Sequence, residues 1–408
     1  MKPIVLLYDT TLRDGAQAED VNFSVEDKVR VARKLDQFGV HYIEGGWPGS
    51  NPRDVEFFKE MRRAQLKKAK LVAFGATRRA RLRVSDDPSM KALISSGAPV
   101  ATIFGKTWDL HVHKALKTTL DENRKMISES VAFLKKHMDE VFYDAEHFFD
   151  GYKANPDYAV STLLAAEKAG ADCLVLCDTN GGTLPHEVEE IIRQVKRRIR
   201  APFGIHAHND AELAVANSLA AIRMGAVQVH GTVNGYGERC GNANLCSLIP
   251  TLKLKMGIDC ISDGSLAKLR DVSRYVDELA NLPHRKRQPY VGDSAFAHKG
   301  GVHVDAVAKS SATYEHVEPE RVGNKRRVLV SDMAGRSNIL QKAAELGISL
   351  AKDGPELTNI LRKVKELENE GYEFEGAEGS LELLMLRAGH NYESVFSMFD
   401  RIDYRILT

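Results

Sequence analysis

Short apolar runs recur between residues 4 and 229, and an amphipathic helical pattern separates each run from the next. The runs are apolar throughout and do not alternate with polar residues, which is typical of parallel strands covered on both faces. We predict eight strands, at Ile4–Tyr8, Tyr42–Glu44, Leu71–Phe74, Val100–Phe104, Glu140–Tyr143, Cys173–Cys177, Phe203–Ile205 and Val227–Val229. This regular strand–helix alternation favours a parallel α/β architecture.

The predicted helices carry recognisable ends. Ser24 to Asp27 resembles a capping box, with Asp in place of Glu, and should begin a helix that runs to Phe38. Four helices should end in a glycine that accepts the left-handed conformation, at Gly39, Gly97, Gly170 and Gly225. Eight strand–helix units in about 255 residues match a (β/α)₈ TIM barrel in number and length. A doubly wound sheet is the alternative, but no Gly-rich phosphate turn follows the first strand.

The strand–helix alternation stops near residue 258. We predict a TIM barrel at residues 1–258, a linker subdomain at 259–330 that carries His303, and a helical subdomain at 331–397. Helical patterns in the later part lie at Leu266–Asn281, Arg336–Leu346, Pro355–Asn369 and Gly379–Ala388. Residues 398–408 alternate like the start of a strand, so we expect them to begin a further domain that this chain lacks.

Polar residues follow several predicted strands, where a barrel places its active site. Asp14 follows the first strand, and His206 and His208 end the seventh. Two residues apart on an extended chain, the two imidazoles point to the same side and can reach one ion. A carboxylate with two imidazoles predicts a site for Mn²⁺, Zn²⁺ or Mg²⁺. Asn242 is a candidate fourth ligand through its amide oxygen, with a helix N-cap as the alternative.

Three further residues are candidates for substrate chemistry. Arg13, beside Asp14, offers a bidentate fork for a substrate carboxylate, whereas a buried structural ion pair is the alternative. Glu146 follows the fifth strand and would either position a substrate or anchor a loop. Gly300 and Gly301 precede His303 and predict a mobile loop that carries a base. A structural histidine is the alternative reading of His303.

Composition excludes several classes of protein. Lys and Arg number 57 against 56 Asp and Glu, and a net charge of +1 argues against nucleic acid as a partner. The chain has no run of 18 apolar residues, so we expect no membrane span. Its start leads directly into a strand-like run, so we expect no signal peptide and a cytoplasmic protein. The five cysteines form no Cys-x-x-Cys pair and should be reduced.

Three motifs together resemble those of the α-isopropylmalate/homocitrate/citramalate synthase family. They are Leu12–Gln17 with Lys28, His206–Asp210 and Gly231–Asn242, in the family's order. The resemblance covers nearly the whole chain. Three other segments are more like the citramalate synthase branch than the isopropylmalate branch, namely Glu44–Pro52, Glu146–Tyr152 and Gly371–Glu375.

The resemblance implies an acyltransferase that joins acetyl-CoA to a 2-oxo acid, with pyruvate favoured, in a Claisen condensation on a divalent metal. It also implies a homodimer with active sites completed in trans, a role in isoleucine biosynthesis, and a C-terminal regulatory domain that would begin near Met398. The metal ligands it implies are Asp14, His206, His208 and Asn242. The residues it places at the oxo acid or in acid–base chemistry are Arg13, Thr179, Glu146, His303 and Asp305.

Two positions depart from the family pattern. Glu212 stands where the second motif often has glycine, and no tyrosine corresponds near Arg326 to the one expected in the isopropylmalate branch. The same chemistry with 2-oxoisovalerate or 2-oxoglutarate is the nearest alternative function. A retro-Claisen lyase or aldolase is disfavoured by the segment that carries His303. A catalytically inactive, metal-stabilised scaffold would be expected to lack Arg13 or His303.

Overall fold

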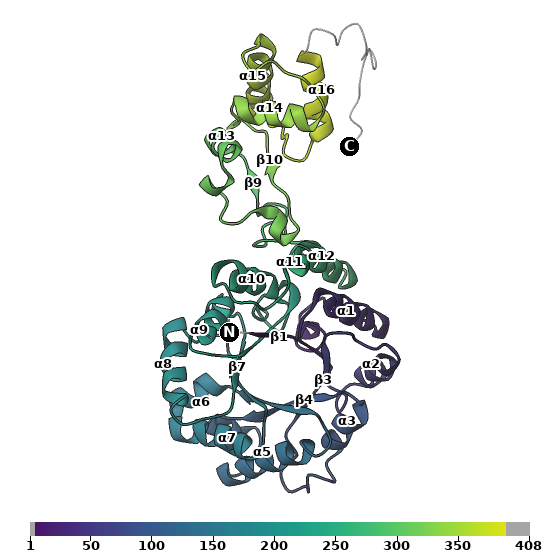
Figure 1. The fold of residues 1–408 in the computed structure, drawn as a ribbon, viewed down its shortest axis with the longest axis vertical. Helices are drawn as coiled ribbons and strands as arrows, with labels where there is room; N and C mark the ends of the chain where they lie inside the picture. The colour runs from purple at the N-terminus through teal and green to yellow at the C-terminus, as the bar shows by residue number, and fades with distance from the viewer. Residues whose placement is uncertain (1–4, 389–408) are drawn as a thin grey trace. The chain divides into compact units, whose positions relative to one another are not determined.

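The computed structural model of the chain describes residues 5–388. Eight parallel strands close into a barrel in sequence order, and β1 pairs with both β2 and β8 (Figure 1). The strands are β1 (Leu6–Asp9), β2 (Tyr42–Gly46), β3 (Lys70–Ala76), β4 (Val100–Lys106), β5 (Glu140–Glu146), β6 (Cys173–Asp178), β7 (Phe203–Ala207) and β8 (Gln228–Gly231). The predicted (β/α)₈ barrel is therefore confirmed, and the closed ring excludes a doubly wound sheet.

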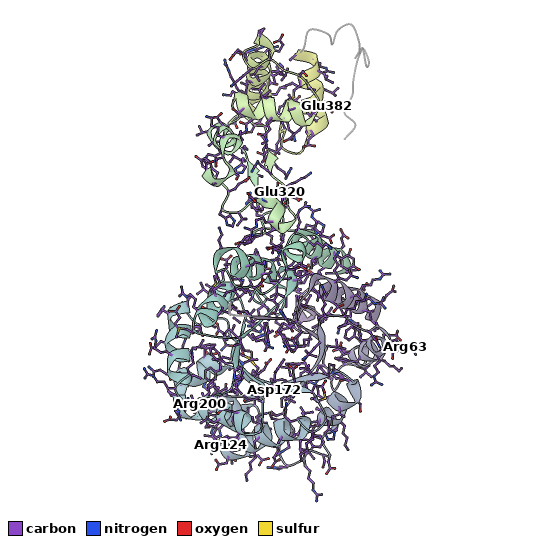
Figure 2. The ribbon with its side chains drawn as sticks, in the orientation of Figure 1. Arg63, Arg124, Asp172, Arg200, Glu320 and Glu382 are labelled. Atoms are coloured by element: carbon purple, nitrogen blue, oxygen red, sulfur yellow. The ribbon has the colours of Figure 1, made fainter. Side chains whose placement is uncertain are left out.

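Helices form a layer around the strands (Figure 1). They are α1 (Val25–Phe38), α2 (Pro52–Arg63), α3 (Pro88–Ser96), α4 (Asp109–Lys114), α5 (Leu120–Leu134), α6 (Phe148–Ala154), α7 (Pro156–Lys168), α8 (Pro185–Val195) and α9 (Ala214–Arg223). Charged side chains such as Arg63 at the end of α2 and Arg124 on α5 lie on the outer side of this layer (Figure 2). The helices thus bury their apolar faces against the strands.

The expected helix ends are present. Ser24 Oγ accepts from the backbone N–H of Asp27, whose carboxylate accepts in return from Ser24 N–H at 3.0 Å. This capping box begins α1, which ends at Phe38 before Gly39. The predicted helix-ending glycines all have positive φ, at Gly39, Gly97, Gly170 and Gly225. Because glycine has no Cβ, it adopts this conformation at little cost and lets the chain turn into the next strand.

An apolar cluster fills much of the barrel interior. Its members are Tyr8, Tyr42, Val72, Val100, Phe142, Cys173, Val175 and Cys177. Tyr8 also stacks on His230, with ring centroids 3.7 Å apart. The filled interior leaves the carboxyl ends of the strands as the place for a cavity, as in other barrels of this type.

The structure divides into two compact units. The first comprises the barrel to Arg285 with residues 289–292, and the second comprises residues 286–288 and those from Asp293 onward. Beyond β8 the first unit contains α10 (Leu245–Pro250), α11 (Asp263–Leu266) and α12 (Leu269–Leu279). Helix α12 packs beside α1, where Lys34 forms an ion pair with Asp271.

The second unit has its own small core. Its main elements are β9 (Ala297–His298), α13 (Gly301–Lys309), β10 (Arg327–Val328), α14 (Arg336–Glu345), α15 (Pro355–Asn369) and α16 (Glu378–Ala388). Buried residues from α14, α15 and α16, such as Ile339, Ile360 and Leu381, form one apolar cluster. The predicted late helices are confirmed. The expected start of a further domain at residues 398–408 lies outside the described residues.

None of the helices in residues 5–388 is both long and apolar enough to cross a lipid bilayer.

Candidate active site

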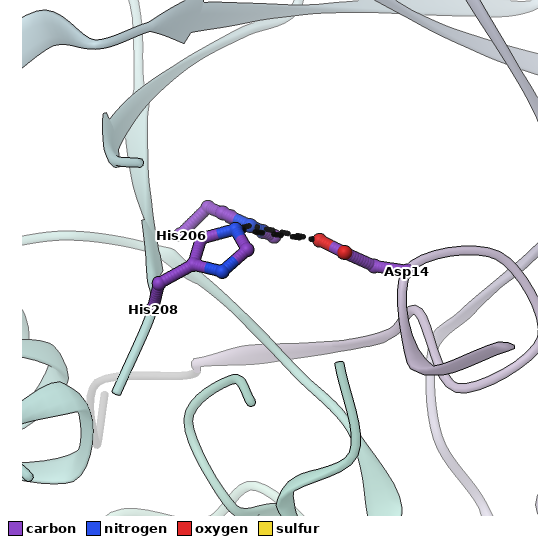
Figure 3. Close-up of side chains that lie close together, drawn as sticks. All are labelled: Asp14, His206 and His208. Carbon is purple, nitrogen blue, oxygen red and sulfur yellow. Dashed lines mark hydrogen bonds and ion pairs between the residues drawn. The ribbon is translucent and has the colours of Figure 1, made fainter. Parts of the chain in front are cut away.

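Asp14, His206 and His208 meet at the carboxyl ends of the strands (Figure 3). Asp14 begins a short 3₁₀ turn (Gly15–Gln17) after β1, His206 lies in β7, and His208 follows that strand. The Asp14 Oδ2 atom is 3.2 Å from His206 Nε2 and 3.6 Å from His208 Nε2, and the two Nε2 atoms are 3.2 Å apart. All three side chains are buried. The predicted convergence of these residues is confirmed.

This geometry fits a divalent cation. Ligand atoms at about 2.0–2.2 Å from one ion lie about 3–3.5 Å from one another, which matches the spacing of the two imidazole nitrogens. Burial, with His206 alongside, lowers the pKa of His208 to about 4, so the ring is neutral and keeps a lone pair at neutral pH. Burial would raise the pKa of Asp14, but Arg13 and the two histidines hold it well below its usual value.

Asn242 completes this group from the loop after β8. Its Nδ2 lies 3.0 Å from Asp14 Oδ2 and 3.3 Å from His206 Nε2. Its Oδ1 is buried, and no residue among 5–388 donates a hydrogen bond to it. Because rotation of the amide exchanges the two atoms, the oxygen can take the place beside Asp14 and His206 and serve as a fourth ligand.

The loop that carries Asn242 follows a tight path. A bridge joins His208 to Asn242, and the Gly241 carbonyl accepts from Asn209 N–H at 2.8 Å. Gly237 has a φ of 151°, and a Cβ placed on it would overlap the Asn242 side-chain oxygen. Glu212, the departure from the family pattern, adopts a left-handed backbone with φ 59°, the conformation that glycine accepts most easily.

Arg13 is anchored by a buried carboxylate. Its Nε donates to Glu44 Oε2 at 2.6 Å, its Nη1 lies 3.3 Å from Asp14 Oδ2, and its guanidinium lies over the Phe74 ring at 3.8 Å. Glu44 is fully buried and also accepts from Tyr8 at 2.6 Å. The structural ion pair considered for Arg13 is therefore present. Arg13 also lines the cavity, and its contact with a substrate carboxylate stays a prediction.

The cavity beside this group has a volume of about 200 Å³. Its aromatic wall consists of Trp47, Phe74 and Phe104, which contact one another through edge and stacked arrangements. The acidic side chains that line it are Asp14, Asp144, Glu146 and Glu238, whereas the basic ones are Arg13 and Arg239. Asp14 is the carboxylate next to both imidazoles, so its charge favours a cation at the histidine cluster.

Thr179 and Glu146, which the family resemblance places at the oxo acid, both line the cavity. Thr179 Oγ1 accepts from the His147 backbone N–H at 2.9 Å, so its own hydroxyl hydrogen remains available to a ligand. Glu146 forms an ion pair with Lys106, its partner across the β4–β5 ladder. The fifth strand extends to Glu146, which makes this residue part of the rigid barrel and not of a loop.

His303 and Asp305 belong to the second unit. The prediction of a mobile loop around His303 is wrong, because Gly301–Lys309 forms helix α13. A Cβ on Gly301 would lie 2.8 Å from the Gly335 backbone nitrogen, so this glycine allows close packing and does not act as a hinge. His303 is exposed, and its ring lies tilted against that of Tyr314, with ring centroids 4.2 Å apart. Asp305 forms an ion pair with Lys309 at 2.6 Å, which lowers its pKa.

Sequence reasoning assigned no role to Asp144, although it lines the cavity. It is buried, and its Oδ1 has no hydrogen-bond partner in the described part of the chain. Burial, more than any neighbouring charge, raises its pKa to about 7. The signal that would have found it is its spacing of two residues from Glu146, because alternate residues of a barrel strand face the interior.

The comparisons with known proteins agree with this fold. A family model described as HMGL-like matches residues 5–276, which include the entire barrel. The chain belongs to the HMGL-like family. A second family model, homocitrate synthase post-HMGL domain-like, matches residues 290–372 of this family member.

Within the HMGL-like family, this member belongs to the citramalate synthase branch. It is 61% identical to the (R)-citramalate synthase of Geobacter sulfurreducens over 404 residues, which cover 99% of this chain and 76% of that protein. It is 59% identical to the enzyme of that name from Aquifex aeolicus, with the same coverage. A 2-isopropylmalate synthase of Methanocaldococcus jannaschii is 33% identical over 90% of this chain and 68% of that protein. The resemblance inferred from the motifs is confirmed.

Among solved structures, the HMG-CoA lyase of Bacillus subtilis matches this HMGL-like chain with a TM-score of 0.59. The two are 21% identical, and the match covers 70% of this chain and 97% of the lyase. This likeness shows a shared barrel fold.

Proposed function

We propose that this chain is an (R)-citramalate synthase, which joins acetyl-CoA, pyruvate and water to give (R)-citramalate and CoA for isoleucine biosynthesis. The observation that carries the proposal is the 61% identity over 404 residues with an enzyme of that name. That span includes both compact units. The cluster of Arg13, Asp14, His206 and His208 around one cavity supports it independently.

Asp14, His206 and His208, with the amide oxygen of Asn242, would hold one divalent cation. Three findings support this set: the converging ligand atoms, the Asn242 oxygen with no donor among the described residues, and the charge of the Asp14 carboxylate beside both imidazoles. A bound divalent cation would act as a Lewis acid that polarises the keto group of a 2-oxo acid. Mn²⁺, Zn²⁺ and Mg²⁺ all accept these donor types.

The side chains around the cavity suit an anionic 2-oxo acid. Arg13, fixed by Glu44, would donate to the substrate carboxylate and balance the negative charge that develops on the keto oxygen. Thr179 would donate its free hydroxyl hydrogen to the same substrate. Glu146, held by Lys106, would orient the substrate from the end of β5.

We assign the acid–base chemistry to His303, with Asp305 beside it on α13. His303 would take a methyl proton from acetyl-CoA, and the enolate carbon would then attack the keto carbon of pyruvate. Water would cleave the thioester and release CoA. An imidazole is suited to this role because it can accept a proton and then return it, here to the alkoxide that the attack leaves on the former keto oxygen.

The second unit would act on the barrel of a partner subunit in a homodimer. Val302 is 77% exposed next to His303, and Met333, whose carbonyl bonds to Gly301, is 63% exposed. Large apolar side chains exposed together around a candidate base are typical of a surface that another chain covers.

A thiol-release assay with acetyl-CoA and a panel of 2-oxo acids tests the proposed function. We expect the highest kcat/KM with pyruvate. The value for 2-oxobutyrate should be lower but measurable, because one methylene changes the transition-state binding free energy by only about 1–3 kcal/mol in such a pocket. A clear preference for 2-oxoisovalerate or 2-oxoglutarate would replace citramalate synthase by an isopropylmalate or homocitrate synthase. Thiol release that does not require a 2-oxo acid would contradict the condensation itself.

A further inference from the structure

The side chain of Arg239 joins three loops at the carboxyl ends of the strands. Its Nε and Nη2 donate to the two carboxylate oxygens of Asp210, at 2.7 and 2.9 Å. Its Nη2 also donates to the Thr179 carbonyl oxygen at 2.7 Å. Thr179 follows β6, Asp210 follows β7, and Arg239 itself follows β8. One guanidinium therefore connects the loops after three consecutive strands.

Each of these loops carries a residue of the proposed site. Thr179 faces the cavity, Asp210 lies two residues after His208, and Arg239 lies three residues before Asn242. The planar guanidinium fork suits this task, because it can bind a carboxylate with two parallel hydrogen bonds and keep a further donor for a carbonyl. A lysine cannot reproduce this set of contacts.

The backbone at Arg239, and at a glycine packed against Asp210, adopts positive φ. Arg239 has a φ of 57°, which places a non-glycine residue in the left-handed region. Gly181, with φ 65°, lies so close to Asp210 that a Cβ would overlap the carboxylate. Sterically disfavoured backbone of this kind persists only where the surrounding contacts hold it. The contact is therefore a built feature of these loops.

Backbone hydrogen bonds already hold the metal-ligand loops without Arg239. The Gly241 carbonyl accepts from Asn209, and the Ala207 carbonyl accepts from Ala243 at 3.0 Å. Asp178 and Gly181, on either side of Thr179, accept from the backbone N–H groups of His208 and Ala211 at 3.1 and 3.0 Å. The Thr179 carbonyl itself accepts from the Arg239 side chain, which connects it to the loop after β8. Loss of the Arg239 side chain should therefore shift the Thr179 peptide within its loop and leave His206, His208 and Asn242 in place.

We infer that Arg239 is a positioning residue for the 2-oxo acid. It acts indirectly, because it fixes Thr179 against the metal-ligand loops. The inference rests on the proposed function. Arg239 acts through Thr179, so its removal should change substrate affinity more than turnover or metal affinity.

The test compares Arg239→Gln, Arg239→Lys, Thr179→Val and the double variant Arg239→Gln/Thr179→Val. Kinetics give kcat and the KM for pyruvate, and calorimetry gives Mn²⁺ and pyruvate affinities. We expect Arg239→Gln to raise the pyruvate KM about tenfold with a smaller change in kcat. Mn²⁺ affinity should change by less than about threefold. Arg239→Lys should fall between wild type and Arg239→Gln, and the double variant should match Thr179→Val.

Arg223→Gln is the matched control, because Arg223 forms an exposed ion pair with Glu189 on the helix layer. It should leave every parameter unchanged. An unchanged pyruvate KM in Arg239→Gln, additive effects in the double variant, or an equal loss of Mn²⁺ affinity would each overturn the inference. If the unsubstituted chain neither turns over nor binds pyruvate, the proposed function fails and the inference fails with it. If it does bind pyruvate, the calorimetric affinities decide on Arg239 alone.

Discussion

The guanidinium of Arg13, in the turn after β1, and the carboxylate of Glu44, within β2, form a buried ion pair with 2.6 Å between Nε and Oε2. Glu44 also accepts hydrogen bonds from Tyr8 and Thr10, so the barrel interior sets its position. Because Glu44 is fixed in this way, it determines where Arg13 points. Arg13 is therefore oriented without a bound ligand, which would reduce the cost of ordering it for the proposed contact with a substrate carboxylate.

Replacing Glu44 with Gln should weaken catalysis through Arg13. Removal of one partner of a buried ion pair typically lowers the free energy of unfolding by about 3–5 kcal/mol. We expect kcat/KM for pyruvate to fall about 10²-fold, with the same elution volume and circular dichroism spectrum as wild type. Glu140→Gln is the control, because Glu140 bonds to Tyr42 at the opposite ends of the strands. An equal loss in that variant would indicate a general effect on the barrel.

His208→Ala should abolish high-affinity binding of a divalent metal. The substitution removes one of three converging ligand atoms, whereas Asn242→Ala removes a neutral donor that water can replace, so its loss should be smaller. Calorimetric titration of chelator-treated protein with Mn²⁺ measures both. His186→Ala, an exposed residue on α8, should bind like wild type. Retention of wild-type affinity by the His208 variant would exclude the proposed site.

Mixing two inactive variants tests the proposed exchange of residues between subunits. His208→Ala lacks a working barrel site and His303→Ala lacks the base. If sites form in trans, each mixed dimer holds one intact site, and random exchange of subunits should restore about a quarter of wild-type activity. No recovery after exchange is verified by native mass spectrometry would mean that His303 does not act in trans.

The position of the cluster of Asp14, His206 and His208 could be predicted from the sequence because it depends on simple rules. A period of two places His206 and His208 on one side of a strand, and parallel strands bring their carboxyl ends together, which includes the turn at Asp14. The spacing of the helices and their terminal glycines, such as Gly39, was sufficient to identify a barrel. These features are local in the sequence or follow from the symmetry of the fold.

The pairs Arg13–Glu44 and Lys106–Glu146 could not be predicted in the same way. Each joins different strands, so it depends on the register between them and on the last residue that each strand includes. The helix around His303 was missed for another reason. When only neighbours in sequence are considered, the two glycines before His303 predict a flexible backbone. In the fold, position 301 has no room for a Cβ because the Gly335 backbone packs against it.

Gly237→Ala should weaken metal binding, although Gly237 is not one of the proposed ligands. The new methyl group would occupy the space of the Asn242 amide oxygen, so Asn242 must move away from Asp14. We expect Mn²⁺ affinity to fall about tenfold or more, as it does when groups that orient metal ligands are removed. Gly257→Ala is the control: Gly257 also has positive φ, but a Cβ there would meet no described atom within 4 Å. It should lower stability by about 1 kcal/mol and leave Mn²⁺ affinity unchanged.

Asp9 should make the chain less stable as pH rises toward 8. Burial raises its pKa to about 7, although Thr11 donates to it twice. The folded state therefore holds a proton that the unfolded chain, with an ordinary Asp pKa, releases. The stability that this proton provides is complete below about pH 4 and is lost as pH rises through 7, a difference of about 4 kcal/mol.

Asp9→Asn cannot titrate, so it should lose less stability than wild type between pH 5 and pH 8 in urea unfolding experiments. Asp36→Asn is the control. Three backbone N–H groups of residues 67–69 donate to Asp36 and outweigh the effect of burial, so its pKa is lowered. Asp36 is therefore charged at both pH values, and its replacement should lower the free energy of unfolding by the same amount at each. If the stability difference between Asp9→Asn and wild type does not change with pH, Asp9 does not hold its proton in the folded chain.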